Sequence, residues 1–467
     1  MHYISKTFIY LCTFLVLSKM STYYPKIIVE PPGPKALRII NEDSNFLMQS
    51  FVRWYPLVIE RGYGAIVVDV DGNEYIDLNA GIAVCSIGHC HPRLIEAIEK
   101  QSKKFQHYSI TDFLYEPAVT LAKEIIKITP GNFNKKIFYS NSGAEAIEAS
   151  IKIARGYFNG LRPYIIAYIG SFHGRTLGAL SLTSSKPIQR KWFHPFVPCI
   201  EHIPYPYCYR CPWKQEYPSC NYYCIDFIDE YYLQKYIPPD EVCAIVAEPI
   251  QGEGGYIVPP PEYWIKAKRL CEKYGILFID DEVQAGMGRT GKWFSIEHWN
   301  VTPDIIAIAK GVASGLPLGV TVGREDVMNL PRGAHASTFG GNPISCMAAL
   351  TVINVIRDEK LLENSLKLGE KTMKRLNELM ENYEIIGDVR GKGLMIGIEL
   401  VKDKKSKKPA IKEMEEIIIK CFKKGIALIG AGKSTIRISP PLVITEELLM
   451  KAIDILEETL REVLNSQ

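Results

Sequence analysis

Short, continuous apolar runs alternate with stretches of helical periodicity from about residue 93 onward. Runs that are apolar throughout are typical of parallel strands buried on both faces, and a helix after each strand is typical of α/β proteins. We therefore predict an α/β fold whose large domain has a mainly parallel sheet flanked by helices. The clearest runs lie at residues 136–140, 164–169, 243–248, 276–280 and 304–309.

The chain on either side of this region has other patterns. Residues 25–60 are rich in proline and predict an irregular arm, and the alternating segment that follows turns at Asp71-Gly72, which indicates a β-hairpin. A helical period from Pro343 to Glu381 and a helix at 411–424 indicate a smaller α+β domain. The expected division is an arm and hairpin at 25–85, a large domain at 86–344 and a C-terminal domain at 345–467.

The first residues carry an apolar run from Phe8 to Leu17. It is too short to span a bilayer, and no small-residue cleavage site follows it. Met20 then opens a stretch typical of a cytosolic start. We expect residues 1–24 to be a mis-assigned start or disordered, with the extra start confined to 1–19; a secretory signal is the alternative.

Composition narrows the class of partner. The chain has 467 residues, 47% hydrophobic and 23% charged, which is enough for a large core. Its 55 basic and 52 acidic residues give a net charge of +3, with no basic or acidic tail. This near-balance argues against nucleic acid, and we expect small molecules as partners, no membrane and a cytoplasmic location.

Four of the twelve cysteines form a cluster in the segment 205–226, spaced C-x2-C-x8-C-x3-C. Four thiolates at this spacing can bind zinc or an iron–sulfur cluster. Free thiols on a surface insert, or one or two disulfides, are the alternatives. A structural role is expected in each case, and no metal is expected at the catalytic centre. The residues are Cys208, Cys211, Cys220 and Cys224.

Two residues at predicted strand ends are candidates for catalysis. Lys310 follows the run at 304–309, and Asp281 follows the run at 276–280. Because ligand sites of α/β sheets gather at the carboxyl ends of strands, both are expected at one edge. Burial lowers the pKa of a lysine, as an amine nucleophile requires, and a carboxylate facing a pyridine nitrogen keeps that nitrogen protonated. A solvated lysine and a helix-capping aspartate are the alternatives.

Two further motifs suit ligand binding. NSGAEA precedes a helix, so the amides of Gly143 and Ala144 can bind a phosphate at the helix N-terminus. FHGR offers Phe172 as a flat apolar face and Arg175 as a carboxylate fork. Ordinary helix capping, and a core aromatic beside a surface arginine, explain the same residues without a ligand.

Taken together, the motifs SNSGAEA, FHGRT, EPIQGEGG, DDEVQAGMGRTG, STFGGNP and IRISPPL occur in one order with the Lys310 segment. The chain from about residue 25 onward resembles the class III aminotransferases. These are the ornithine and 4-aminobutyrate aminotransferase group of the fold type I pyridoxal-phosphate enzymes. The resemblance implies that fold, that cofactor and a homodimer or dimer of dimers.

The resemblance also implies roles on the cofactor side. Lys310 matches the Schiff-base lysine, which shuttles the substrate proton, and Asp281 matches the partner of the pyridine nitrogen. Val283 and Phe172 match the residues that sandwich the ring. The remaining matches are Gln284 to the phenolic oxygen, Gly143 and Ala144 to the phosphate, and Thr338 to the phosphate of the neighbouring subunit.

On the substrate side, Arg175 and Arg437 match arginines that hold carboxylates. Glu248 matches a glutamate that masks the second arginine, so that one site accepts both an amine end and a dicarboxylate. Ile82 resembles the apolar residue of the 4-aminobutyrate enzymes. The implied reaction is transamination of an ω-amino acid, or of ornithine, with 2-oxoglutarate.

Two other classes of function are the alternatives to transamination. Relatives with this fold and lysine racemise or epimerise amino acids, but a racemase has no need of a second carboxylate-binding arginine. A non-catalytic relative is expected to lose Lys310 or Asp281, and both are present. Transamination is therefore the favoured hypothesis, and racemisation is the alternative.

Overall fold

The computed structural model describes residues 23–465, so the expectation for residues 1–19 lies outside the described part. Tyr24 is only 8% exposed, and its hydroxyl lies 2.8 Å from that of Tyr63. The folded chain therefore includes Tyr24, within the segment 1–24 that was expected to be a mis-assigned start or disordered.

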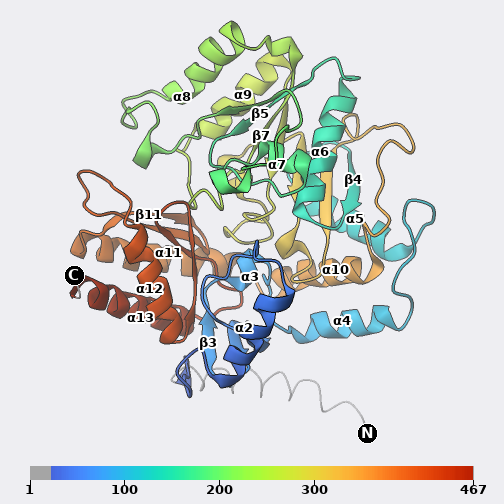
Figure 1. Ribbon diagram of the computed structural model, residues 1–467. Helices are drawn as coiled ribbons and strands as arrows, with labels where there is room; N and C mark the ends of the chain where they lie inside the picture. Colours follow the sequence, from blue (N-terminus) through green and yellow to red (C-terminus); the bar gives the residue numbers. More distant parts are fainter. Residues whose placement is uncertain (1–22, 466–467) are drawn as a thin grey trace.

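A seven-stranded sheet forms the centre of the large domain, in the order β4-β10-β9-β8-β7-β5-β6 (Figure 1). All its strand pairs are parallel except the two that β10 makes with β4 and β9, which confirms the mainly parallel sheet. The strands are β4 (Lys135–Ser140), β5 (Tyr164–Tyr168), β6 (Ile200–Ile203), β7 (Val242–Ala247), β8 (Leu277–Asp281), β9 (Ile305–Ile308) and β10 (Gly319–Arg324).

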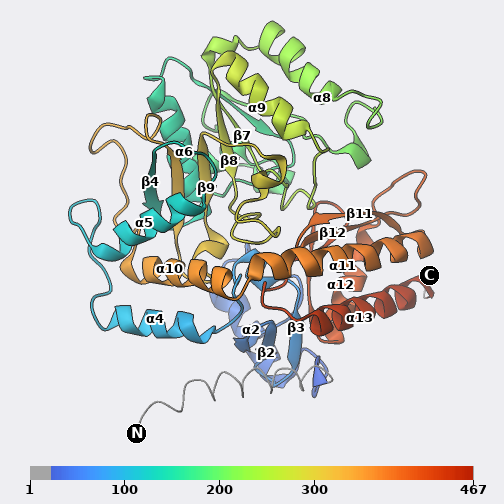
Figure 2. The same ribbon diagram turned by 180° about the vertical axis from the view of Figure 1, so that it is seen from behind.

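Helices cover both faces of this sheet because alternate strand residues point to opposite sides. Ile165 and Ile279 pack against helix α6, whereas Ile166 and Phe278 pack against helix α9. Figures 1 and 2 show these helices with α4, α5 and α10 around the strands. The helices are α4 (Pro92–Ser102), α5 (Glu116–Ile128), α6 (Gly143–Tyr157), α7 (Leu177–Leu182), α8 (Tyr223–Asp226) with the π-helix Phe227–Leu233, α9 (Tyr263–Tyr274) and α10 (Pro343–Asp358).

A smaller α+β domain combines the two ends of the chain (Figure 1). Its two sheets have the orders β1-β2-β3-β13 and β11-β12-β15-β14, so the early hairpin pairs with a late strand. The strands are β1 (Ile59–Tyr63), β2 (Ile66–Asp69), β3 (Glu74–Asp77), β11 (Ile386–Lys392), β12 (Met395–Leu400), β13 (Ile426–Ala427), β14 (Ile429–Ala431) and β15 (Thr435–Ile438). The helices are α2 (Pro34–Phe46), α11 (Leu361–Asn382), α12 (Ile411–Lys423) and α13 (Glu446–Asn465).

The prediction of an irregular arm over residues 25–60 is wrong, because α2 occupies its centre. Pro34 starts this helix at a position where its missing N–H costs nothing. The Asp71 carboxylate, from the β2–β3 turn, accepts hydrogen bonds from the amides of Lys35 and Ala36, each at 2.9 Å. The helix is thus capped by a residue distant in sequence, which local patterns do not reveal.

The single helix predicted from Pro343 to Glu381 is also wrong. The segment forms two helices, α10 and α11, which are separated at Lys360. Lys360 has a left-handed φ of 53°, and no glycine or proline marks the break. The apolar period continues across the junction, so the sequence conceals it.

Candidate active site

The site begins where β8 and β9 end side by side. The amide of Glu282, directly after β8, donates to the carbonyl of Ala307 in β9 at 2.9 Å. Asp281 closes β8 and Lys310 follows β9, so the sheet brings both to one edge as predicted. The neighbouring Asp280 points to the other face, where its two carboxylate oxygens are buried without a hydrogen-bond partner.

Asp281 is fixed by two contacts. Its Oδ2 lies 2.6 Å from Nδ1 of His173, and its Oδ1 accepts a bond from the amide of Val283 at 3.0 Å. Burial lowers the pKa of His173, but the bond to Asp281 and the charge of Asp281 offset burial, and the net shift is upward. His173 therefore fixes the orientation of the Asp281 carboxylate. The FHGR motif predicted roles for Phe172 and Arg175, but it did not predict the contact between His173 and Asp281.

Lys310 has the properties of an amine nucleophile. Burial lowers its pKa, and the nearby carboxylates of Asp281 and Glu248 oppose part of that effect. Its backbone has a left-handed φ of 46°, an uncommon conformation for a residue with a side chain. A lowered pKa increases the fraction of free amine at neutral pH.

The N-terminus of helix α6 packs closely against Val283, the second residue after β8. Gly143 is the first residue of α6, and a Cβ there would lie 2.7 Å from the Cγ1 of Val283. The close approach therefore requires glycine. The first bond along the helix is that of Ala146 to the carbonyl of Ser142, so the amides of Gly143 and Ala144 precede the intrahelical ladder. These amides are positioned to bind an anion.

Phe172 and Gln284 complete the cofactor side. Gln284 is only 7% exposed, and its Oε1 has no hydrogen-bond partner. Phe172 is half-buried and carries the guanidinium of Arg175 over its ring at 5.4 Å. The site thus holds an amine, a fixed carboxylate, an unsatisfied amide, an apolar wall and helix-terminal amides. That donor set fits a phosphorylated pyridine.

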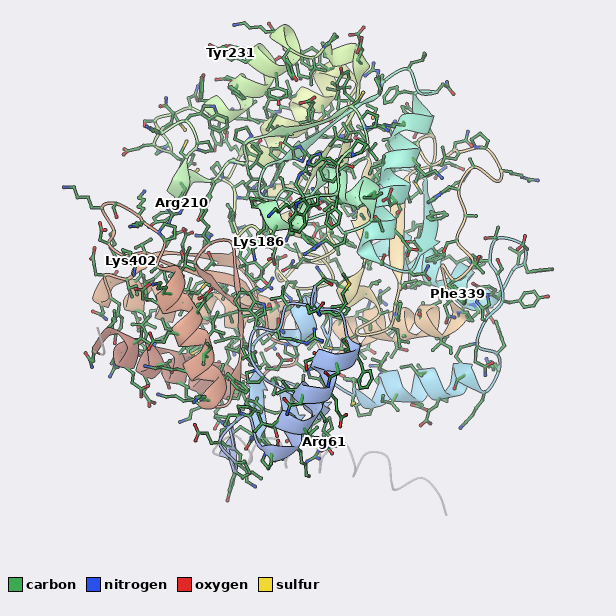
Figure 3. All side chains as sticks on the ribbon, in the orientation of Figure 1. Arg61, Lys186, Arg210, Tyr231, Phe339 and Lys402 are labelled. Atoms are coloured by element: carbon green, nitrogen blue, oxygen red, sulfur yellow. The ribbon has the colours of Figure 1, made fainter. Side chains whose placement is uncertain are left out.

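The substrate side contains a buried arginine, Arg437 on β15, which is 3% exposed. Its Nη1 pairs with Oε2 of Glu253 at 3.3 Å, while the other Glu253 oxygen pairs with Lys186 at 2.8 Å. The charge of Arg437 contributes to lowering the pKa of Lys310, so the two cations are near each other. Figure 3 shows Lys186 on the side of the large domain that faces the small domain.

The predicted pairing of Glu248 with Arg437 is wrong, since Glu253 occupies that position. Glu248 follows β7 directly, and its carboxylate accepts bonds from the amides of Phe172 at 2.8 Å and Gly252 at 2.9 Å. Burial raises the pKa of Glu248 to about 7. The motif EPIQGEGG contains both glutamates, and only the turn after β7 distinguishes them.

Three of the predicted site residues are exposed to solvent in the isolated chain. They are Ile82, Arg175 and Thr338. Ile82 belongs to the short turn α3 (Ala80–Ala83), in which all four residues have left-handed φ values between 50° and 66°. The Asp77 carboxylate holds this turn through the amides of Asn79 and Ala80, each at 2.8 Å, and also contacts His89 at 2.7 Å.

Comparison with known proteins identifies the architecture. Residues 48–460 match the family described as aminotransferase class-III. The chain belongs to the class III aminotransferases. It is 41% identical to the alanine/serine racemase of Pyrococcus horikoshii over 95% of this chain and 94% of that protein. It is 38% identical to the acetylornithine aminotransferase of Caldanaerobacter subterraneus over 91% of this chain and all of that protein (100%).

A solved structure of the same family confirms the fold. The ornithine aminotransferase of Toxoplasma gondii superposes with a TM-score of 0.82 at 30% identity, covering 93% of this chain and 97% of the other. The chain is therefore a fold type I enzyme that depends on pyridoxal phosphate and acts on small amino-acid and oxo-acid substrates. In the described part of the chain, no helix is long and apolar enough to cross a membrane.

This class III aminotransferase also carries the cysteine-rich insert. The four cysteines line one small cavity together with aromatic residues that include Trp213 and Tyr223. They are unpaired, and within residues 23–465 no group of three or more His, Cys, Asp or Glu side chains is placed to hold a metal ion. The four thiols and these aromatic side chains thus form one cluster in the insert.

Proposed function

We propose that this enzyme transfers an amino group from an ω-amino acid such as 4-aminobutyrate, or from the δ-position of ornithine, to 2-oxoglutarate. The products are a semialdehyde and glutamate. The observation that carries this proposal is the buried Arg437, paired with Glu253 at 3.3 Å. A buried guanidinium that has a displaceable carboxylate partner is suited to alternate between masked and open forms.

In the masked form, Glu253 neutralises Arg437, and the pocket suits the uncharged chain next to a terminal amine. When a dicarboxylate enters, its second carboxylate takes over Arg437, and Glu253 keeps its other partner, Lys186, at 2.8 Å. Arg175, whose guanidinium lies 5.4 Å from the centroid of the Phe172 ring, would bind the first carboxylate. The pair thus lets one pocket serve both half-reactions.

The chain's own residues support proton transfer. When bound, pyridoxal phosphate supplies an electron-accepting ring for a substrate carbanion. Lys310 would move the proton at the substrate carbon, and Asp281, which His173 orients, would hold the pyridine nitrogen. Val283 and Phe172 would hold the ring, and Gln284 would bind its phenolic oxygen. The amides of Gly143 and Ala144 would bind the phosphate.

We further propose that the active unit is a homodimer or a dimer of dimers in the cytoplasm. Thr338 is exposed, as a residue that reaches the partner's phosphate needs to be. The adjacent Phe339 is 61% exposed (Figure 3). Leu114 is 90% exposed, in the segment whose Thr111 hydroxyl donates to the carbonyl of Ser337. Such surface favours burial by a second copy. The cysteines in the described chain are unpaired, as a reducing compartment predicts.

Racemisation or epimerisation of an amino acid is the second candidate. It is favoured by the 41% identity to the racemase of Pyrococcus horikoshii. A racemase returns the proton to the opposite face of the same carbon and needs no acceptor. The retention of both Arg175 and Arg437 argues for transamination.

One experiment separates the two candidates. The holoenzyme is incubated with each of a panel of amino donors, with and without 2-oxoglutarate, while glutamate and the donor's enantiomers are quantified. Glutamate formed from an ω- or δ-amino donor supports the proposal. Inversion of an α-amino acid without an oxo acid, and no glutamate from any donor, would replace it with the racemase assignment.

A further inference from the structure

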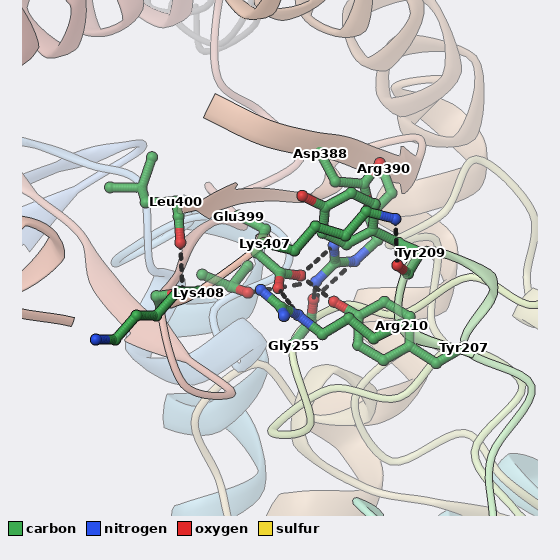
Figure 4. Close-up of polar contacts among 12 residues, drawn as sticks. Tyr207, Tyr209, Arg210, Gly255, Asp388, Arg390, Glu399, Leu400, Lys407 and Lys408 are labelled. Atoms are coloured by element: carbon green, nitrogen blue, oxygen red, sulfur yellow. Dashed lines mark hydrogen bonds and ion pairs between the residues drawn. The ribbon is translucent and has the colours of Figure 1, made fainter. Parts of the chain in front are cut away.

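The cysteine-rich insert contacts the small domain through a buried ionic network. Glu399 on β12 is 4% exposed and accepts hydrogen bonds from two residues of the insert, the hydroxyl of Tyr207 and Nε of Arg210, the latter at 2.5 Å. The insert is continuous with the large domain between β6 and β7. Glu399 therefore joins the two domains (Figure 4).

The same carboxylate holds Arg390 of β11. Nη1 of Arg390 lies 2.7 Å from Glu399 and 2.6 Å from Asp388, and the Tyr207 ring lies 5.0 Å from its guanidinium carbon. Arg390 is 8% exposed and Glu399 is 4% exposed, so their contact is shielded from water, whereas Asp388 is partly exposed. The orientation of Arg390 is therefore strongly determined.

The other side of the Arg390 fork reaches the substrate loop. Nε and Nη2 donate to the carbonyl of Gly255 at 3.1 and 2.6 Å. Gly255 lies two residues after Glu253 and has a left-handed φ of 130°, and a Cβ there would lie 3.2 Å from Nη2 of Arg390. The Gly255 backbone thus packs directly against the Arg390 guanidinium. On the same loop, the Glu253 carboxylate pairs with Arg437.

We infer that Arg390 and Glu399 are positioning residues that set how firmly Glu253 masks Arg437, and that the insert acts on substrate choice through Tyr207 and Arg210. The inference rests on the proposed function, because it deepens the role of the Glu253–Arg437 pair. A fixed loop keeps Glu253 at Arg437 and favours donors with a terminal amine. A loosened loop leaves Arg437 open more often and favours dicarboxylates.

The test compares Glu399→Gln, Arg390→Lys and Tyr207→Phe/Arg210→Gln with the wild-type holoenzyme. The measured quantity is kcat/KM for glutamate divided by kcat/KM for the best ω- or δ-amino donor. We expect this ratio to rise about five- to twentyfold, mainly through a lower KM for glutamate. Lys407→Gln is the matched control, because Lys407 also bonds the insert, at the carbonyl of Tyr209 (3.0 Å), but on the outer side of the network.

A second measurement excludes a merely structural role. Glu399→Gln is repeated in a Glu253→Gln background, in which there is no charge left to position, and we expect no further change in the ratio. Equal losses with both substrates, the same rise in the Lys407 variant, or a full rise in the Glu253→Gln background would each overturn the inference. Failure of the proposed function is distinguishable, since the wild-type enzyme itself would then form no glutamate from any donor.

Discussion

The cofactor side and the substrate side of this site are built in different ways. Asp281 and Lys310 stand at the ends of adjacent, hydrogen-bonded strands, so sheet order alone brings them together. Arg437 on β15 and Glu253 on the loop after β7 come from different domains and meet through an ion pair of 3.3 Å. The cofactor side is therefore rigid and determined by topology, whereas the substrate side is adjustable and determined by interdomain packing.

The largest effect is expected on the rigid side. Lys310→Ala removes the amine that binds the cofactor and moves the proton, so turnover should fall by about 10⁴-fold or more. The visible absorbance of the holoenzyme and its borohydride-trappable linkage should be lost as well. Lys136→Ala is the control, since that lysine pairs with Glu325 on the surface. A Lys310→Ala enzyme with normal turnover would falsify the catalytic assignment.

On the adjustable side, Arg437→Lys should leave the cofactor spectrum intact and impair the acceptor. Lysine replaces the charge but not the planar fork. The loss of a buried charge-assisted pair costs about 2–5 kcal/mol, or roughly thirty- to several-thousand-fold in kcat/KM for 2-oxoglutarate. A monocarboxylate donor should be affected much less. Normal 2-oxoglutarate kinetics in this variant and in Arg175→Lys would move the racemase assignment ahead.

The comparison can be sharpened with the two glutamates of EPIQGEGG. Glu253→Gln should unmask Arg437 and raise the preference for glutamate over the ω-amino donor about tenfold. Glu248→Gln should leave that preference unchanged, because Glu248 bonds backbone amides instead. Steady-state kinetics with both substrates measures the effect. A change of preference in the Glu248 variant alone would restore the pairing first expected from the sequence.

The smallest expected effect is a change in how the stability of the fold depends on pH. Burial raises the pKa of Glu248 to about 7, so the folded protein binds this proton more tightly than the unfolded chain does. Its contribution to stability is complete below the ordinary glutamate pKa and is lost as pH rises toward 7, by at most roughly 3 kcal/mol. Glu248→Gln should therefore flatten the decline in melting temperature between pH 5 and 8. An unchanged pH profile of the holoenzyme would show that Glu248 does not titrate in this range.

The sequence is sufficient for the parts that depend on local pattern. Continuous apolar runs predicted the parallel strands, and their ends predicted that Asp281 and Lys310 share one edge. The antiparallel β10 was not anticipated, because its position between β4 and β9 depends on pairing across the sheet. Helix α2 was missed for a similar reason, since Asp71 caps it from another element.

The contacts on the substrate side could not be predicted from local sequence pattern. Glu248 and Glu253 are five residues apart and chemically identical, and only the course of the loop decides which reaches Arg437. His173 was overlooked because its importance lies in a contact with Asp281, 108 residues away in the chain. Contacts of this kind depend on three-dimensional distances that periodicity does not encode.

The turn at Ala80–Ala83 has a consequence for protein engineering. A left-handed backbone costs roughly 1–2 kcal/mol for a residue with a Cβ, and Ile82 is β-branched, which makes φ of 66° especially unfavourable. Replacing Ile82 with glycine is therefore expected to relieve backbone strain, and it removes an exposed side chain at the position that resembles the apolar substrate contact of the 4-aminobutyrate enzymes. Most mutations reduce stability, and stability and activity often trade off against each other. At this position the acceptance of bulkier amines and a higher melting temperature are expected to improve together.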